Sequence, residues 1–115
     1  MSDTRSVGKQ AEDRAANYLL GLGYTLVTRR FKSSRGEIDL IALDGETLVF
    51  VEVKYRARGH ERAAEAVGWT KQQRFHQAVK EYLAKADHPP MPSRYDLITL
   101  DEKSIRHEQD AFRPE

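Results

Sequence analysis

Three ionisable residues interrupt two apolar segments between residues 36 and 54, GEIDLIALDGETLVFVEVK. Asp39 lies within the run IDLI, and Glu52 and Lys54 alternate with valines in FVEVK. A buried charge is costly unless it is paired or coordinates a metal ion. Two neighbouring carboxylates repel each other, and a hard divalent cation such as Mg²⁺ relieves that repulsion. Because such an ion polarises phosphoryl oxygens and a nearby lysine can orient water, this set of residues indicates phosphodiester hydrolysis.

A β-hairpin must position these residues, because Asp44-Gly45 between alternating apolar runs is a strong turn signal. If Asp44 and Gly45 are the two turn residues, Leu43 pairs with Glu46, and the two acids are diagonal neighbours on one face. A four-residue turn over 44–47 would place the acids directly opposite each other, again on one face. A three-residue turn would separate them unless a bulge restored the register.

The spacing of Asp39 and Glu52-Val53-Lys54 resembles the PD-(D/E)xK nuclease signature, with GEID in place of the Pro-Asp element. The longer strings GEIDLI and VFVEVK, followed by a helix that opens TKQ, are similar to the YraN-like bacterial proteins, a family related to Holliday-junction resolvases and RecB-type nuclease domains. The resemblance covers residues 8–112. It implies an α/β fold with a restriction-endonuclease-like (resolvase-like) core, in which helices flank a central mixed sheet whose hairpin carries the site.

The resemblance also implies a metal site. Asp39 and Glu52 would ligate Mg²⁺ or Mn²⁺ with the carbonyl of Val53, and Lys54 would position the attacking water. In the related nucleases a glutamate of the first helix often joins this site, and Glu12 is the matching position. An exposed helix acid is the alternative interpretation of Glu12.

Basic residues flank the hairpin although the net charge is only +1. They could contact phosphates on either side of a metal site, or they could form a merely solvated surface. The candidates are Arg29, Arg30, Lys32, Arg35, Arg56 and Arg58, joined by Lys71 and Gln72 at the start of a helix.

Periodicity and turn residues predict the remaining elements. A helix is expected over 6–22, a strand over 24–31, a short helix over 61–67, and a helix from Thr70 to Ala86 with a capping-box pair at Thr70 and Gln73. A strand over 95–100 and a short edge strand over 104–108 follow. Asp96 is interpreted as structural, and surface roles are expected for the four histidines, His60, His76, His88 and His107.

Length and composition bound the protein class. The 115 residues predict one domain spanning 1–115, with a core over about 8–112. The chain has no cysteine, no signal core and no apolar run long enough to span a bilayer, so we expect a cytoplasmic protein that does not associate with membranes. The related resolvases are dimers, so a homodimer is a possible assembly.

The sequence therefore predicts a Mg²⁺- or Mn²⁺-dependent endonuclease that acts on branched or otherwise structured DNA. One alternative is a nuclease-fold module that binds nucleic acid or a protein partner without catalysis. Another is a single-stranded RNA binder in which Tyr55 and Trp69 stack on bases, although core or rim packing is the favoured interpretation of both aromatic residues.

Overall fold

The computed structural model describes residues 4–56 and 67–112, which form two helices and five strands. The predicted elements that fall within these residues are found with boundaries that differ by a few residues. In chain order the elements are α1 (Thr4–Gly21), β1 (Thr25–Lys32), β2 (Glu37–Asp44), β3 (Thr47–Tyr55), α3 (Trp69–Lys85), β4 (Ser93–Leu100) and β5 (Ile105–Glu108). Arg58, His60 and all but Val67 of the predicted 61–67 helix lie outside the described residues.

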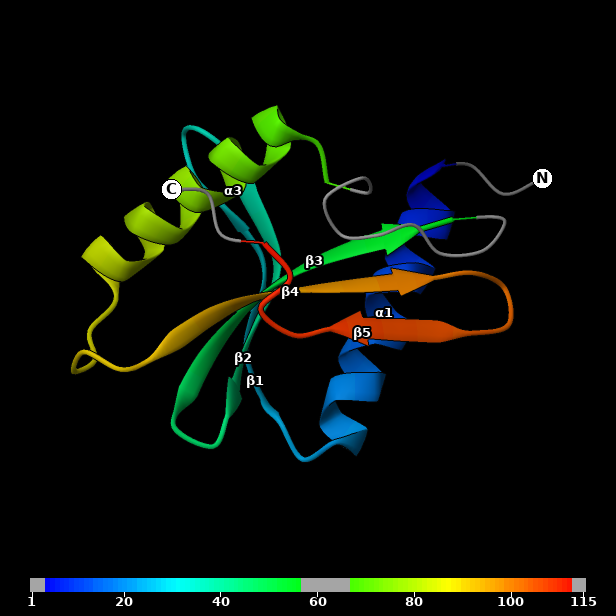
Figure 1. Ribbon diagram of the computed structural model, residues 1–115, viewed down its shortest axis with the longest axis horizontal. Helices are drawn as coiled ribbons and strands as arrows, with labels where there is room; N and C mark the ends of the chain where they lie inside the picture. Colours follow the sequence, from blue (N-terminus) through cyan, green and yellow to red (C-terminus); the bar gives the residue numbers. More distant parts are fainter. Residues whose placement is uncertain (1–3, 57–66, 113–115) are drawn as a thin grey trace.

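The strands form one mixed sheet in the order β1-β2-β3-β4-β5 (Figure 1). Strands β3 and β4 are parallel and are connected through α3, whereas the other neighbours are antiparallel. The predicted α/β architecture with a central mixed sheet is therefore confirmed. Within the described part of the chain, neither helix is long and apolar enough to cross a membrane.

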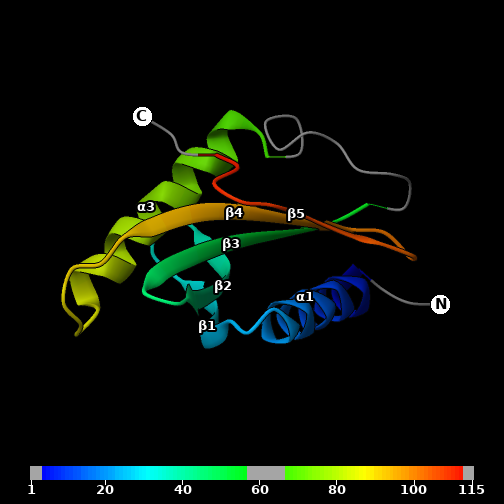
Figure 2. The same ribbon diagram turned by 60° about the horizontal axis from the view of Figure 1, so that its bottom comes forward.

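The two helices cover opposite faces of the sheet, and each closes its own apolar core (Figure 2). On one face, the alanines of α1 and Leu19 pack against Val49, Val51 and Ile98. On the other face, Phe75, Ala78 and Val79 of α3 pack against residues that include Ile41, Phe50 and Leu97. Strand β3 is apolar on both faces because it lies between these two cores.

The hairpin register differs from the one predicted for a turn at Asp44-Gly45. Leu43 pairs with Leu48 rather than with Glu46, and the turn residues are Gly45 and Glu46. Gly45 adopts a φ of 60°, which glycine tolerates without steric cost. The observed register is the alternative that places Asp39 directly opposite Glu52.

The start of α3 also differs from the prediction. Gly68 is the N-cap and no side chain caps the helix, so the Thr70/Gln73 capping box is wrong. The Gln72 side chain instead donates to the carbonyl of Val67 at 2.7 Å. Trp69, the first helical residue, is 73% exposed, so packing in the core or rim is also wrong for this residue.

A buried polar network is centred on Asp96 of β4. Arg94 and His107 contact the carboxylate of Asp96, and the Asp110 amide donates to it at 3.0 Å. Burial alone would raise the pKa of Asp96, but these hydrogen bonds outweigh it and lower the pKa. The structural interpretation of Asp96 is confirmed, whereas a surface role is wrong for His107, whose side chain is almost fully buried.

A close contact between Gly36 and α3 generates the first prediction. A Cβ atom at Gly36 would overlap the backbone carbonyl oxygen of Arg74 and lie 2.8 Å from its carbonyl carbon. Because neither backbone can give way easily, Gly36→Ala should lower the free energy of unfolding by about 1–3 kcal/mol in urea denaturation. Gly21→Ala is the control, since no atom lies within 4 Å of its added Cβ. Equal effects of the two substitutions would contradict the packing account.

Candidate active site

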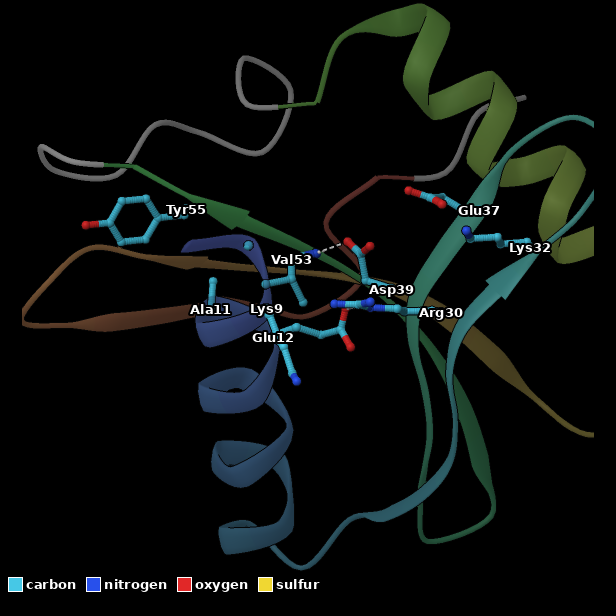
Figure 3. Close-up of a pocket in the computed structure, with 10 residues that line it drawn as sticks. Lys9, Ala11, Glu12, Arg30, Lys32, Glu37, Asp39, Val53 and Tyr55 are labelled. Atoms are coloured by element: carbon cyan, nitrogen blue, oxygen red, sulfur yellow. Dashed lines mark hydrogen bonds and ion pairs between the residues drawn. The ribbon is translucent and has the colours of Figure 1, made fainter. Parts of the chain in front are cut away.

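The two hairpin acids meet where β2 and β3 separate. Paired residues end at Leu40 and Val51, although both strands continue beyond this point. Beyond this point a side chain takes the place of a backbone acceptor. Oδ2 of Asp39 accepts a hydrogen bond from the backbone amide of Val53 at 2.8 Å (Figure 3). This bond anchors Asp39 beside the segment that carries Glu52 and Lys54.

Glu52 is buried, with only 3% of its surface exposed. Its Oε1 lies 3.2 Å from Nζ of Lys71, whereas Oε2 receives no hydrogen bond. Burial raises the pKa of Glu52 most, the neighbouring Asp39 carboxylate raises it further, and Lys71 opposes both effects, which leaves a pKa of about 9. At neutral pH and without a metal ion, Glu52 therefore holds a proton next to Asp39.

Lys54 follows Glu52 by two residues on β3 and is partly buried. Burial lowers the pKa of this lysine, and the positive charges of Lys71 and Arg56 lower it further, against the opposing charges of Glu52 and Asp39. Lys71 lies near Glu52 through the contact described above, and strand alternation places Lys54 on the same face of β3 as Glu52. The structure brings Asp39 beside the segment of β3 that carries Glu52 and Lys54, and the catalytic roles of these residues stay a prediction.

A cavity of about 730 Å³ opens beside Asp39. Charged side chains from α1, β1 and β2 line it together with Val53 and Tyr55 of β3 (Figure 3). The charged lining residues are Lys9, Glu12, Arg30, Lys32, Glu37 and Asp39. Of the three hairpin residues Asp39, Glu52 and Lys54, only Asp39 is among the residues that line this cavity.

Glu12 lines this cavity, but its carboxylate is bound by arginines. Arg29 contacts Oε1 at 3.0 Å, and Arg30 contacts Oε2 at 2.9 Å. The prediction that Glu12 faces the hairpin is consistent with its place in the cavity, yet its oxygen atoms are neutralised by cations here. Arg30 reaches Glu12 from a backbone φ of 53°, a left-handed conformation that is costly for arginine.

The other predicted basic residues have diverse environments. Arg29 also pairs with Asp13. Both Arg29 and Arg30 therefore form ion pairs with acidic residues of α1. Lys32 lines the cavity, Arg35 is exposed in the β1–β2 loop, and Arg56 is partly buried beyond the end of β3. The Gln72 side chain donates a hydrogen bond to the Val67 carbonyl.

Two charged cavity residues were not predicted as site residues. Lys9 lies three positions before Glu12, and Glu37 lies two positions before Asp39. Helical spacing places positions 9 and 12 on one face of α1, so sequence periodicity contained the signal for Lys9. Glu37 had a weaker signal, because the first residue of a strand can belong to the preceding polar loop as well as to the strand.

The residues present fit a divalent metal ion in part. Asp39 and Glu52 offer the oxygen ligands that Mg²⁺ and Mn²⁺ prefer, and Glu52 Oε2 is buried without a donor. Mg²⁺ commonly takes one or two carboxylates and retains several waters. Among residues 4–56 and 67–112, however, no three histidine or acidic side chains are close enough to form a metal-binding group.

The fold and the site define a small α/β protein with paired carboxylates at the divergence of two sheet strands. Residues 11–100 match the model of "Uncharacterised protein family UPF0102", and the chain belongs to this family. The predicted resemblance to YraN-like proteins is thereby confirmed.

Three relatives illustrate the match. The chain is 41% identical to a UPF0102 protein of Halorhodospira halophila over 115 residues, covering 99% of this chain and 93% of that protein. It is 41% identical to one from Chlorobaculum tepidum, covering 92% of this chain and 87% of the relative. It is 42% identical to one from Methylibium petroleiphilum, covering 97% and 98%, respectively.

The raised pKa of Glu52 generates the second prediction. Unfolded Glu52 ionises near 4.5, whereas the native group titrates at about 9, so its contribution to stability is fully present below pH 4.5 and is lost as the pH rises through 9. Glu52→Gln keeps the shape and cannot ionise. In metal-free buffer at pH 8, it should raise the free energy of unfolding by on the order of 2–4 kcal/mol.

Urea denaturation between pH 5 and 9 measures this effect. Glu46→Gln, at the exposed hairpin tip, is the matched control and should follow the wild-type curve. A Glu52→Gln curve parallel to wild type over the whole range would mean that Glu52 does not titrate as described.

Proposed function

We propose that the protein is a Mg²⁺- or Mn²⁺-dependent endonuclease with a resolvase-like core that hydrolyses phosphodiester bonds in branched or structured DNA. The observation that carries this proposal is the buried Glu52 carboxyl, which lies against Asp39 and has an oxygen atom without a donor. A polar group left in that state costs stability, and a functional site is the usual reason for such a cost.

Each residue has a distinct role in the proposed reaction. Asp39 and Glu52, with the Val53 carbonyl, would hold the divalent ion, and the amide of Val53 fixes the orientation of Asp39. The chemistry that such an ion supplies is the polarisation of a phosphoryl oxygen and a lower pKa for a nearby water. Lys54, whose pKa is already lowered, would orient the attacking water and balance negative charge that develops on the phosphate.

Cations around the site would hold the DNA backbone. Lys32 lines the cavity, and Lys71 reaches Glu52 while its side chain remains half exposed. Phosphate contacts of this kind position a substrate without reading its sequence. One such site cuts one strand, so cutting both strands of a junction symmetrically would require a homodimer.

A second candidate function is nucleic-acid binding without catalysis. The ion pairs that Glu12 makes with Arg29 and Arg30 favour it, because they neutralise the acid that would otherwise enlarge the ligand set. In this case the cavity would still bind a phosphate backbone. The two functions differ in turnover and in the need for a divalent ion.

A cleavage assay separates these functions. Purified protein is incubated with Mn²⁺ and a four-way junction, a flap or a linear duplex, and the products are resolved on denaturing gels. We expect cleavage of the branched substrates and a loss of about 100-fold or more in rate for Asp39→Asn and for Lys54→Met, because each removes a group that acts on the reacting phosphate. Glu46→Gln is the control acid on the same hairpin and should cleave normally.

Binding is measured in parallel in the presence of EDTA, where hydrolysis cannot proceed. Salt-sensitive binding without cleavage of any substrate would support the non-catalytic function. Cleavage that is undiminished in Asp39→Asn would identify a contaminating nuclease and overturn the proposed site.

A further inference from the structure

A second cleft of about 620 Å³ lies between the β1–β2 loop and the first turns of α3, and we name it the α3 cleft. Three cations and one acid line it, together with small polar groups and one aromatic ring. The lining residues are Lys32, Ser33, Gly36, Glu37, Thr70, Lys71, Arg74 and Phe75. The excess of cations favours an anionic ligand.

The α3 cleft adjoins the cavity beside Asp39. Lys32 and Glu37 line both spaces, and Figure 3 shows these two side chains on the side of Asp39 that faces α3. Lys71 lines the cleft as well, and its Nζ lies 3.2 Å from Glu52. In the α3 cleft, the backbone of a nucleic-acid strand would therefore contact Lys71, which in turn contacts Glu52.

Trp69 directly precedes Thr70, the first residue of α3 that lines the cleft. It is the single tryptophan of the chain, and 73% of its surface is exposed. A large aromatic ring left in water at the first turn of a helix adds no packing to either core. Exposed aromatic rings combined with basic clefts are typical of proteins that stack unpaired bases, and Trp69 lies one residue before the lining of such a cleft.

We propose that the α3 cleft binds a single-stranded stretch of DNA, with Lys32 and Arg74 on its phosphates and Trp69 stacked on an unpaired base. Single-stranded DNA fits because its bases are free to stack on a ring, whereas a duplex hides both faces of each base. The carboxylate of Glu37 faces the same space and would keep the phosphates on the Arg74 side. The inference rests on the proposed nuclease function, since it names the substrate feature that would lead a strand to Asp39 and Glu52.

Tryptophan emission tests the stacking contact directly, because Trp69 is the only source of that signal. The full-length protein in EDTA is titrated with a short single-stranded oligonucleotide and with the duplex of the same sequence. We expect saturable quenching by the single strand and little change with the duplex. Trp69→Ala should weaken binding of a labelled single strand by about tenfold in anisotropy, and Trp69→Phe should retain most of the affinity.

Salt dependence tests the phosphate contacts. Each contact to a single strand contributes about 0.7 to the slope of log K against log salt concentration. Arg74→Ala should lower the slope by about that amount, and Trp69→Ala should lower the affinity at unchanged slope. Lys80→Ala is the matched control, because it removes an exposed cation from the same helix outside the cleft.

Absence of quenching, equal quenching by the duplex, or equal effects of Arg74→Ala and Lys80→Ala would overturn the inference. None of these measurements requires hydrolysis. Single-strand binding therefore stands if the cleavage assay fails, and cleavage of junctions stands if Trp69 proves irrelevant.

Discussion

The structure depends on one constraint, the juxtaposition of a buried carboxyl and an anchored carboxylate where two sheet strands part. Leu40 and Val51 end the ladder, and the Asp39 side chain replaces the next backbone acceptor by binding the Val53 amide. Both cores support this arrangement, because β3 is packed on each face. Helix α3 covers Glu52 and supplies Lys71, and the missing side chain at Gly36 lets the helix approach β2 closely.

Two buried acids of the same sheet have opposite electrostatic environments. Asp96 is fully buried, accepts bonds from a cationic side chain, a histidine and a backbone amide, and has a lowered pKa. Glu52 is nearly as buried, yet it faces another acid, retains an oxygen without a donor and has a raised pKa. The first acid stabilises the fold, whereas the second keeps an unsatisfied oxygen, which in the function proposed above would bind a cation.

Local patterns were sufficient for the elements and for the convergence of Asp39, Glu52 and Lys54, because strand alternation and a strong turn signal act over few residues. The observed turn, Gly45-Glu46, lies one residue after the predicted turn, Asp44-Gly45. Either turn would use the conformational freedom of Gly45, so the turn signal alone did not fix the register. The arginine partners of Glu12 and the exposure of Trp69 could not be predicted. Both depend on contacts between elements that are remote in sequence, which periodicity along one helix does not encode.

The central claim is that a divalent cation takes the place of a proton on Glu52. Calorimetric titration of the protein with Mn²⁺ at pH 7, in two buffers of different ionisation enthalpy, counts the protons released on binding. With a pKa of about 9, Glu52 is protonated before binding, so one ion should bind per chain with release of about one proton, and Glu52→Gln should abolish that release. Binding without proton release, or release that is unchanged in Glu52→Gln, would contradict the account.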